Sequence, residues 1–541
     1  MEVTPGPEES TAESAGREAL SNRITLAKPS VRTSLFASVL AGAAALTAAS
    51  PADAAGLYLP DRGVRPLGRG GAFVAGADDL GAFAYNIAGT YDAGASVLID
   101  ASWVNYTTDY TRQAIVNQVD PNTGETVGKY LQTYPTVNGS TPFLPIPTLA
   151  VSFQPHPQWV ISLGAYAPYA GLPTYPDQVN GKPAPQRYSL LSLNGSALAF
   201  IGAGAAFAPN PEWRFGIEAG VLAGTFQSTV AFSGCVPEKF LCATEDPQWD
   251  VLAELKAVPI VAPTGQLGAQ WIPSPKVRAG LSFQLPVFVR AGATIHTRLP
   301  ATPVFEKASQ QGDTANIAFD LPWSLRAGVE LRPLENLRIE VGGGYDAWSM
   351  HDKIHVAAKG VALKNIAAFP ETYYIPPIDL PRRFQDTFSV RGGLEYTLSL
   401  AGLKWDGRAG IAYESGAVPT DYLHVLTLDG DKLVPSVGLS VHIGKARFDA
   451  VYAHVLMFDR QVDPATAKIA QVSPVVANPP AQPDYVNGGM YSARADIIGL
   501  GFTYQFGAVP KEFAAPAGAA AAPEKKPDST EKKVEDTEKK D

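Results

Sequence analysis

Segments in which apolar and polar residues alternate with a period of two recur along most of this chain. In residues 276–285, KVRAGLSFQL, every second residue from Val277 is apolar, and the residues between them are arginine, glycine, serine and glutamine. The same alternation recurs in the ranges 214–224, 324–332, 337–345, 388–396 and 405–414. A period of two gives a β-strand one apolar and one polar face. The sequence therefore predicts an all-β fold.

Short and long connections between these segments alternate along the chain. The short, turn-forming connections lie at 155–158, 209–212, 273–276, 333–336, 400–404 and 444–447. The long connections occupy 107–147, 167–195, 231–260, 299–314, 350–385, 414–433 and 458–492. If 276–298 is one long strand, this order predicts an antiparallel transmembrane barrel of about fourteen strands, with short turns at one end and long loops at the other. A soluble sandwich has no reason to sort its loops by length in this way.

Hydropathy and aromatic residues also favour a membrane barrel. After the first 54 residues, no apolar run approaches the length of about 20 residues that a helical span needs, so a membrane-spanning chain of this kind must close its strands into a barrel. Aromatic residues lie near both ends of the predicted strands, as in the interfacial belts of such barrels. The predicted belt residues are Trp159, Trp213, Trp271 and Trp405 at the short turns and Trp103, Trp348, Tyr166 and Tyr413 at the other ends.

Residues 1–54 have the pattern of a signal peptide with an atypical N-terminal extension. Lys28 and Arg32 flank the start of an apolar stretch, which is followed by the small-residue site Ala52-Asp53-Ala54. The residues before Lys28 are acidic, unlike the start of a signal peptide. A signal anchor is the alternative, but the stretch is short and rich in alanine for a membrane span. We expect export, with the mature chain starting near Ala55.

The other end of the chain and its overall charge bear on its partners. For the C-terminal tail, a contact with the cell wall or a periplasmic carrier stays open. Residues 507–541 combine an Ala/Pro-rich stretch with mixed charges and no apolar period, so we expect a disordered periplasmic tail. The formal net charge is −9. Such a balance provides no basic face for nucleic acid, and no nucleic-acid partner is expected.

The segment Asp61–Gly89 is rich in glycine and lies between the export signal and the first predicted strand, near Val97. A phosphate-binding loop is one interpretation of Gly68, Gly70 and Gly71. However, Phe73 takes the place of the third glycine of G-x-G-x-x-G, and no Gly-Lys-Ser/Thr follows. Glycine also allows tight bends and close packing against other backbone. We therefore predict a plug inside the barrel.

The stretch GLYLPDRGVRPLGRGGAFVAGADDLGAFAYNIAG resembles the N-terminal hatch of the fatty-acid and aromatic-hydrocarbon transporters of Gram-negative outer membranes, the FadL/TodX type. The shared pattern is G-x-R-x-x-G-R-G-G-A-F-x-A-x-A-D-D, which starts at Gly63 and is followed by Tyr85-Asn86 and Ala88-Gly89. Similar landmarks are AYAPYAGL from Ala165, DLPWSLRAGVELRP from Asp320, YDAWS from Tyr345, FQDTFSVRGGLEY from Phe384 and RAGIAYESGAVP from Arg408. One departure is Ile87, where the family usually has proline.

This resemblance implies a monomeric outer-membrane barrel over residues 96–506 with a hatch, residues 55–95, in its lumen. The ligand would be a hydrophobic small molecule, either a fatty acid or a hydrocarbon. It would enter among extracellular loops, reach a luminal pocket, and leave sideways toward the outer-membrane lipids through a kink in the third strand, near Gly164 and Tyr166. Neither a cofactor nor an energy source is implied. The hatch residues implied in gating are Gly68, Arg69, Gly70, Gly71, Phe73, Asp78, Asp79, Asn86, Ile87 and Ala88.

Charged residues lie on the polar faces of the predicted strands. A charge on the lipid-facing side of a barrel costs about 2–4 kcal/mol at the midplane, so these side chains should face the lumen. Both signs are present, and they can pair with each other or with Arg65, Asp78 and Asp79 of the hatch. A structural ladder between plug and wall is one interpretation, and an arginine that binds a ligand carboxylate is the other. The residues are Arg278, Arg326, Glu330, Arg338, Glu340, Arg391, Glu395 and Arg408.

Other candidate sites are weaker. Ser440 and His442 could start a hydrolase dyad, but no third group is evident. A metal site at His351, Asp352 and His355 would lack further ligands, and none is predicted. Cys235 and Cys242 share one predicted loop in an oxidising compartment, which favours a disulfide.

Three function classes therefore remain. The first is passive uptake of long-chain fatty acids or similar hydrophobic molecules, including aromatic hydrocarbons. The second is a general diffusion porin, which the predicted plug disfavours. The third is an outer-membrane lipid hydrolase, for which the chain lacks a convincing catalytic set, so we expect no enzyme activity.

Overall fold

The structure is a computed structural model, and it describes residues 62–120, 122–123, 126–141, 145–169, 173–193, 195–236, 242, 245–472 and 484–506. The predicted signal peptide (1–54), the first residues of the predicted hatch (55–61) and the predicted tail (507–541) lie outside the described residues. No helix in the described part of the chain is long and apolar enough to cross a membrane.

Fourteen antiparallel strands form a closed barrel, as the alternation of turns and loops predicts. Each strand pairs with its neighbour in the sequence, and β1 closes the ring against β26 from Ser96↔Gln505 to Arg112↔Gly489. Four strands consist of two segments each. In chain order the strands are β1 (Ser96–Val119), β4 (Pro145–His156), β5 (Trp159–Tyr169), β8 (Ala197–Phe207), β9 (Trp213–Ser233), β10 (Asp250–Ser274), β11 with β12 (Val277–Gln284, Val287–Arg298), β14 with β15 (Thr314–Leu321, Ser324–Leu334), β16 with β17 (Leu337–Asp346, Lys353–Ala358), β20 with β21 (Ile378–Pro381, Thr387–Leu400), β22 (Leu403–Glu414), β23 (Lys432–Ile443), β24 (Ala446–Met457) and β26 (Gly489–Gln505).

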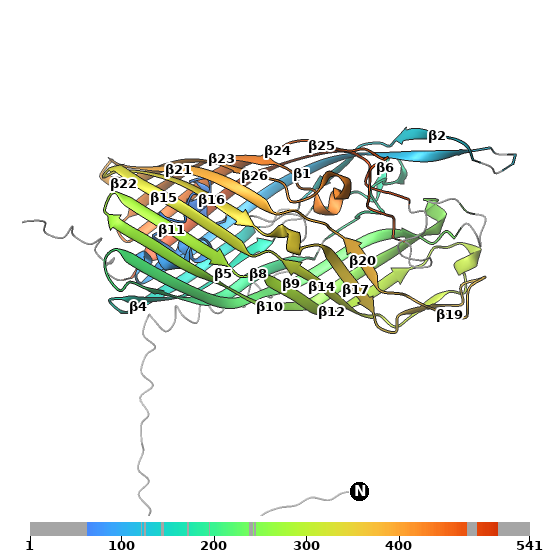
Figure 1. Ribbon diagram of the computed structural model, residues 1–541, viewed down its shortest axis with the longest axis horizontal. Helices are drawn as coiled ribbons and strands as arrows, with labels where there is room; N and C mark the ends of the chain where they lie inside the picture. Colours follow the sequence, from blue (N-terminus) through green and yellow to red (C-terminus); the bar gives the residue numbers. More distant parts are fainter. Residues whose placement is uncertain are drawn as a thin grey trace, which may run out of the picture.

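The six predicted short turns all connect barrel strands and gather at one end of the barrel, on the left in Figure 1. Two long connections were predicted too long. The range 231–260 is mostly strand, because β9 and β10 continue pairing to Ser233↔Asp250, and 107–147 contains the end of β1 and β2 (Thr126–Thr133). Pairing of backbone groups continues beyond the segments with apolar alternation, so the sequence does not mark the ends of these strands.

The predicted single strand 276–298 is interrupted. β11 ends at Gln284 and β12 begins at Val287, with Leu285 and Pro286 between them. Pro286 has no backbone N–H with which to continue the ladder. The partner strand is divided in the same way, since β11 pairs with β15 whereas β12 pairs with β14.

The outer face of the barrel is apolar. Side chains such as Ile217, Val341 and Leu500 expose more than half of their surface. One sequence neighbour of each on the inner face is buried, namely Glu218, Glu340 and Gly499. Near the short turns, Trp159 stacks on Phe207 with ring centroids 4.5 Å apart. Two predicted belt residues do not belong to this surface: Tyr166 and Trp348 are buried and face the interior.

Residues 62–95, called the hatch segment below, lie inside the turn-side half of the barrel (blue in Figure 1). The segment contains α2 (Val64–Leu67), η1 (Leu80–Ala84) and η2 (Ile87–Ala93). The Asp79 and Asn86 side chains cap η1 and η2 by accepting hydrogen bonds from the N–H groups of Gly81 and Ala88. α2 contacts β23, β24 and β26, while η2 contacts β8, β9 and β10 on the other side of the lumen.

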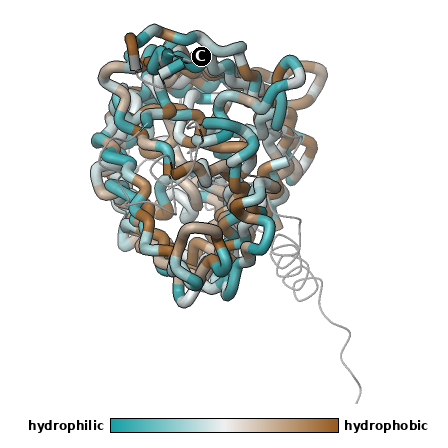
Figure 2. The backbone as a smooth tube through the Cα atoms, turned by 90° about the vertical axis from the view of Figure 1, so that its right-hand side faces the viewer, coloured by the Kyte–Doolittle hydropathy of each residue, from teal (hydrophilic) through white to brown (hydrophobic). Residues whose placement is uncertain are grey.

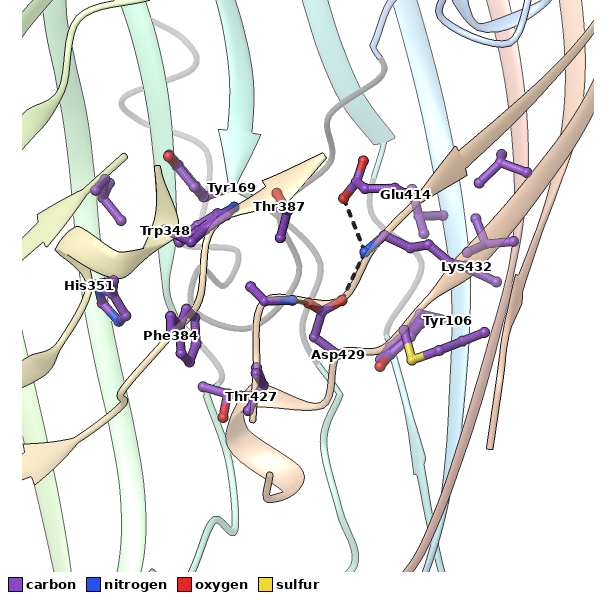
Figure 3. A pocket seen from close by; sticks show the side chains of 18 of the residues that line it. Tyr106, Tyr169, Trp348, His351, Phe384, Thr387, Glu414, Thr427, Asp429 and Lys432 are labelled. Carbon is purple, nitrogen blue, oxygen red and sulfur yellow. Dashed lines mark hydrogen bonds and ion pairs between the residues drawn. The ribbon is translucent and has the colours of Figure 1, made fainter. Parts of the chain in front are cut away.

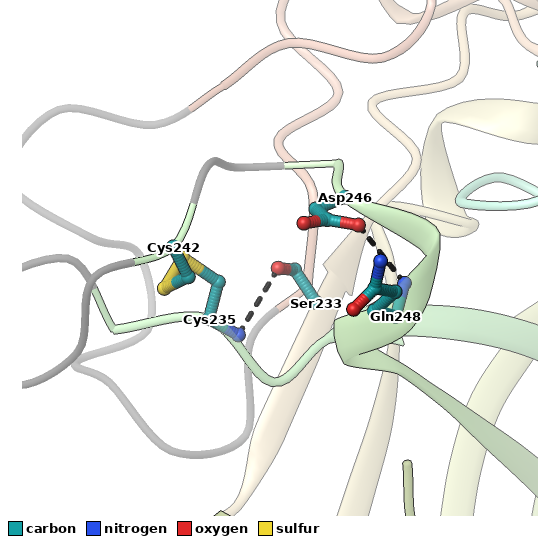
Figure 4. The surroundings of a disulfide bond; sticks show 5 residues. All are labelled: Ser233, Cys235, Cys242, Asp246 and Gln248. Carbon is teal, nitrogen blue, oxygen red and sulfur yellow. Dashed lines mark hydrogen bonds between the residues drawn. A yellow bond between two sulfur atoms is a disulfide. The ribbon is translucent and has the colours of Figure 1, made fainter. Parts of the chain in front are cut away.

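The loop end carries short elements that fold over the barrel mouth (Figure 2). β13 (Ser309–Gln311), β18 (Ala362–Lys364) and β19 (Thr372–Tyr374) form a small sheet, and η3 (Pro247–Trp249) and η4 (Pro303–Phe305) pack beside it. Cys235 and Cys242 form a disulfide in this region, with Cα atoms 5.9 Å apart (Figure 4). The remaining short elements are β3 (Val137–Ser140), β6 (Gln178–Val179), β7 (Lys182–Pro183), β25 (Arg460–Val462), η5 (Trp348–Met350), η6 (Thr420–Tyr422) and η7 (Val425–Thr427).

Candidate functional site

Glycines on the inner wall allow the hatch segment to approach the barrel closely. A Cβ on Gly164 of β5 would lie 2.6 Å from the ring of Phe83, and a Cβ on Gly216 of β9 would lie 2.5 Å from the backbone of Ala88. These contacts leave no space for a side chain at either glycine. Wall and hatch are therefore in direct backbone contact at several points.

Glycines of the hatch segment also allow it to approach the wall closely. Gly70 and Gly71 have positive φ angles of 62° and 72°, a conformation that glycine adopts without strain. A Cβ on Gly70 would lie 2.5 Å from the backbone nitrogen of Ile411, and one on Gly68 would lie 3.2 Å from Gly438. The glycine-rich stretch thus packs against β22 and β23 and does not form an open phosphate cradle.

Arg65 and Arg338 connect the hatch segment to the wall through acidic residues of both. Arg65 contacts Asp78 at 2.6 Å, Asp79 at 3.0 Å and Glu395 of β21 at 2.8 Å. Arg338 of β16 contacts Asp78 at 2.9 Å and Glu395 at 3.1 Å. All of these groups are largely buried, so the charges stabilise one another in place of water.

A second charge cluster surrounds Arg69, whose side chain is fully buried. Its guanidinium lies 2.7 Å from Glu330 and 3.1 Å from Glu340. Glu340 also accepts hydrogen bonds from three successive hatch N–H groups, those of Val74, Ala75 and Gly76, at 2.7–2.9 Å. One wall carboxylate therefore holds three consecutive backbone N–H groups of the hatch segment.

The remaining predicted lumen charges also lie in the interior. Arg278 contacts Asp92 of η2 at 3.0 Å, and Arg326 lies over the ring of Tyr85. Arg408 contacts Glu395 at 2.5 Å and Asp449 at 3.2 Å, and Arg391 lies 3.4 Å from Glu414. Sequence reasoning missed Arg447 of β24, which contacts Asp79 at 2.7 Å. Its alternation with Asp449 on the polar face of 446–457 is the signal that could have found it.

The hatch bend at Asn86-Ile87-Ala88 has a feature that proline would abolish. The backbone N–H of Ile87 donates a 2.8 Å hydrogen bond to the side-chain oxygen of Gln266 on β10. The Asn86 amide donates to the carbonyl oxygens of Val74 and Ala269. A proline at position 87 would restrict the backbone of this bend through its ring. In this chain, hydrogen bonds to the wall fix the bend instead.

The irregularity of the third strand lies after Tyr166 and not at Gly164. β5 pairs regularly with β8 from Trp159↔Phe207 to Tyr166↔Phe200, including Gly164↔Gly202, and the register shifts only between Tyr166 and Tyr169. Pro168, which cannot donate a ladder hydrogen bond, lies in that shift. The Tyr166 ring stacks on Phe200 at 5.1 Å and meets Phe83 of the hatch segment edge-on at 6.3 Å.

Two mostly apolar cavities lie between the loops and the hatch segment. The inner cavity, of about 110 Å³, is lined by aromatic and aliphatic side chains that include Tyr106, Trp348 and Phe384 (Figure 3). Leu67 of the hatch segment also lines it. The outer cavity, of about 520 Å³, lies among the loops and is lined by residues such as Tyr188, Leu363, Pro377 and Leu426. Phe226, Ile354 and Arg382 line both cavities. Sequence reasoning did not find these linings, since they assemble from many loops.

The acidic groups at the inner cavity already have a cation. Lys432 lies 3.1 Å from Glu414 and 2.8 Å from Asp429 (Figure 3). The cluster is compact and leaves the rest of the lining apolar. The cluster of Lys432, Glu414 and Asp429 is therefore a small polar patch at the edge of the apolar inner cavity.

Arg382 is different, because it is 4% exposed and forms no ion pair within the described residues. Its Nη1 donates a 2.9 Å hydrogen bond to Nε2 of His424. Burial lowers the pKa of Arg382 to about 10, so the guanidinium stays charged at neutral pH. Burial and the nearby Arg382 charge lower the pKa of His351 to about 4 and hold the pKa of His424 well below its usual value. Both histidines are therefore neutral at pH 7.

The weaker candidate sites do not assemble. Ser440 contacts Asp449 and Arg408, while His442 contacts Asp406 at 2.6 Å. His351, Asp352 and His355 contact Asp320, Arg383 and Asp379, respectively, and do not converge. In the described ranges, no three metal-ligating side chains form a group.

Comparison with known proteins gives one family and several similar structures. A sequence model of the family described as outer membrane protein transport protein (OMPP1/FadL/TodX) matches residues 45–506. A Pseudomonas aeruginosa FadL homologue shares 15% identity and a TM-score of 0.59, over 84% of this chain and 100% of that chain. The P. putida toluene transporter TodX shares 15% identity and a TM-score of 0.51, over 79% and 94% of the two chains. No curated protein sequence matches the chain. At this identity, the structural likeness establishes the fold.

Proposed function

The chain belongs to the outer membrane protein transport family OMPP1/FadL/TodX and is an outer-membrane transporter of hydrophobic compounds; from this premise we propose that it takes up long-chain fatty acids or similar hydrophobic molecules passively. The observation that carries the proposal is the pair of apolar cavities that leads from the loops to Leu67 of the hatch segment. Ligand sites for hydrophobic molecules have this composition, with few polar groups.

The size of the inner cavity supports displacement of the hatch segment. Binding sites for small molecules usually enclose about 300–1,000 Å³, whereas the inner cavity holds about 110 Å³. A long acyl chain that moves inward must therefore shift part of the cavity wall. Leu67 belongs to that wall and to the hatch, so the advancing ligand acts directly on α2.

A lateral exit beside β5 is the next proposed step. Phe83 and Tyr166 are in contact across the boundary between hatch and wall, and the strand becomes irregular just beyond Tyr166. In this conformation β5 is paired with β4 and β8, so the exit is closed. Movement of Phe83 would remove the inner support of this strand. The proposed transporter acts as a monomer and delivers its ligand to the outer-membrane lipids without a cofactor.

A general diffusion porin is the alternative function, and the filled lumen disfavours it. Residues 62–93 are almost all buried, and their charges are paired with the wall. A porin needs a water-filled channel at this level. The same family relationship leaves aromatic hydrocarbons as a second ligand class.

The proposal can be tested by filling the inner cavity. Ala412 lines that cavity, and its neighbour Ile411 faces outward with 49% exposure. We expect Ala412→Phe to abolish uptake of radiolabelled oleate by cells that depend on this transporter, and Ile411→Phe to leave it unchanged. Equal uptake by both variants, at equal amounts of folded barrel, would show that the ligand does not use this cavity.

A further inference from the structure

The sixth and seventh strands of the barrel stop pairing over part of their length. β10 pairs with β11 as far as Gln266↔Gln284 and pairs with β12 from Ala257↔Ala293 onward. Between these two ladders, the ranges 258–265 and 285–292 form no ladder pair with each other, although the structure describes every residue in them. These two ranges are called the wall window below.

The seventh strand changes its alternation at Pro286, on the turn side of the wall window. Before this proline, the exposed side chains of Leu281 and Leu285 show that odd-numbered residues face outward. After it, Phe288 is exposed and Val289 is fully buried, so even-numbered residues face outward. One extra residue has therefore been inserted into this strand at the proline, as in a β-bulge.

β10 makes the same change only at the far side of the wall window. Val261 and Leu267 are both exposed, so odd-numbered residues of β10 face outward throughout the window. The bulge of β10 comes later, between Ala257 and Ile260. Within the window the two strands are therefore one residue out of step. A slip of one residue turns the side chains of a strand to the opposite face, which explains why the two ranges do not pair.

Side chains close the wall window in place of a backbone ladder. At the turn-side edge, the Leu285 N–H donates a 2.9 Å hydrogen bond to the Gly265 carbonyl oxygen, and the Thr264 hydroxyl donates to the Leu285 carbonyl oxygen at 3.1 Å. The next residue of β10 in this series is Pro263, which has no N–H to donate. Further along, the inner side is sealed by apolar packing of buried side chains, namely Ile260, Ala262, Val287 and Val289.

This construction makes the wall window easier to open than a paired stretch of wall. Between β5 and β8, separation of the strands would break the ladder from Trp159↔Phe207 to Tyr166↔Phe200. Lipid offers no partners for the backbone groups that would be released. Separation at the wall window needs only a rearrangement of apolar side chains, and an acyl chain can replace those contacts with its own.

A small cavity of about 30 Å³ lies behind the wall window. Thr264, Leu285 and Val287 of the window line it, and so do Tyr166 and Pro168 of β5. The cavity therefore connects the irregular part of β5 with the unpaired part of the wall. A molecule that reaches Tyr166 from the lumen lies close to both.

We propose that the wall window is a second lateral port, through which a single-chain hydrophobic molecule passes between β10 and β12 to the outer-membrane lipids. The inference rests on the proposed function and adds a route to it. The outer surface of the window suits this passage, since Val258, Val261 and Phe288 are exposed apolar side chains.

A covalent bridge across the wall window tests the port in cells whose oleate uptake depends on this protein. Val261→Cys combined with Phe288→Cys, joined by a bis-maleimide, holds the two strands together. Cys235 and Cys242 form a disulfide and do not react. The control bridge joins Leu267→Cys to Phe283→Cys, a pair within the ladder of β10 and β11. We expect partial loss of oleate uptake with the window bridge and no loss with the control bridge.

A third bridge assigns the remaining uptake to the exit beside β5. Ile161→Cys and Ala205→Cys join β5 to β8 at a ladder pair. Together with the window bridge, this bridge should abolish oleate uptake. Full uptake with the window bridge, or complete loss with the β5–β8 bridge alone, would overturn the second port and leave the proposed function intact. No uptake by the unbridged wild type would contradict the proposed function itself.

A single substitution tests the same port if the cysteine variants do not fold. A Cβ at Gly292, in the wall window, has no atom within 4 Å, and neither has one at Gly392 of β21, whose neighbours pair on both sides. Both positions therefore accept a large side chain without a clash. Gly292→Trp should lower oleate uptake by covering the window, whereas Gly392→Trp should not. Equal uptake by the two variants, at equal amounts of folded barrel, would exclude the port.

Discussion

Gly410 of β22 lies directly against the backbone of Arg69, so that a Cβ at Gly410 would overlap the peptide bond between Arg69 and Gly70. Gly407, three residues earlier on the same strand, has no atom within 4 Å of the corresponding position. The pair provides a matched test of whether the hatch segment is held by close contact with the wall.

Gly410→Ala should displace the hatch segment without harming the barrel, because backbone atoms cannot yield as a flexible side chain would. We expect higher single-channel conductance in a planar bilayer and faster cleavage of the hatch segment by trypsin, while Gly407→Ala behaves like the wild type. If both variants match the wild type, the hatch is not seated by this contact.

Removal of residues 61–89 should give a folded barrel that conducts small ions and no longer selects hydrophobic cargo. The interior of a barrel of about eight strands is just filled by its own side chains, so a barrel of about fourteen strands encloses space that its wall side chains do not fill. Conductance of the shortened chain, compared with the full chain, checks this. A shortened chain that conducts no more than its parent would show that another part of the molecule closes the lumen.

Glu340→Gln should loosen the hatch segment more than its small change in size suggests. The amide would lose the charge that faces Arg69 and would present a donor to the N–H groups of Val74, Ala75 and Gly76. Breaking one partner of a buried ion pair costs about 3–5 kcal/mol. Hydrogen exchange of residues 72–77 should rise, whereas Glu212→Gln in an exposed turn should not change it.

Cys235 and Cys242 should be accessible from outside the cell only after reduction. They are joined within the loop end of the barrel, and this end faces outward if the short turns face the periplasm. An impermeant maleimide added to intact cells should label the chain after treatment with a reductant and not before. Labelling without reductant would contradict the disulfide in cells, and failure to label after reduction would contradict the orientation.

Acidification should loosen the segments around His351 and His424. Their pKa values are lowered in the folded protein, to about 4 for His351, so above about pH 6.5 both folded and open forms are neutral and stability is independent of these groups. As the pH falls below about 6.5, the histidines become protonated in the open form but stay neutral in the folded form. The local free energy of opening therefore decreases by up to about 1.4 kcal/mol for each pH unit and each histidine. Asp320 and Asp352 oppose the effect at His351, and Arg382 strengthens it at both rings.

Hydrogen exchange of residues 420–428 at pH 7.5 and pH 5, corrected for the intrinsic rate, measures this effect. His424→Gln keeps an acceptor for Arg382 but does not titrate, so it should remove most of the dependence on pH in that segment. A protection pattern that is the same at both pH values in the wild type would refute the prediction.

The strands were predictable because each carries its own signal. Residues 324–332 and 405–414 alternate strictly, since lipid on one side and the polar lumen on the other demand it. By the same argument, the charged residues on the inner faces could be assigned to the lumen. The ion-pair partner of each charged residue could not be predicted in this way. Whether Glu340 meets Arg69 or another cation depends on the path of the hatch segment, which no local pattern encodes.

The ligand path was not predictable, because its walls come from distant loops. Arg382 follows a short strand and precedes Arg383, and the sequence gives no reason to distinguish two neighbouring arginines. The fold buries the first and exposes the second. Likewise, Gly164 is a reasonable kink in the sequence, but the hatch ring of Phe83 lies against it and the strand remains regular there.

The pairing of β1 with β26 sets an order for assembly. The last barrel strand pairs with the first along all of β26, from Ser96↔Gln505 to Arg112↔Gly489, so the wall remains an open sheet until the C-terminal strand has arrived. The hatch segment draws its partners from β10, β15, β16, β21 and β24, and Arg447 is among the last of these to be synthesised. A partly assembled sheet would leave hatch carboxylates without their cations. Seating of the hatch and closure of the ring should therefore occur as one late, cooperative event.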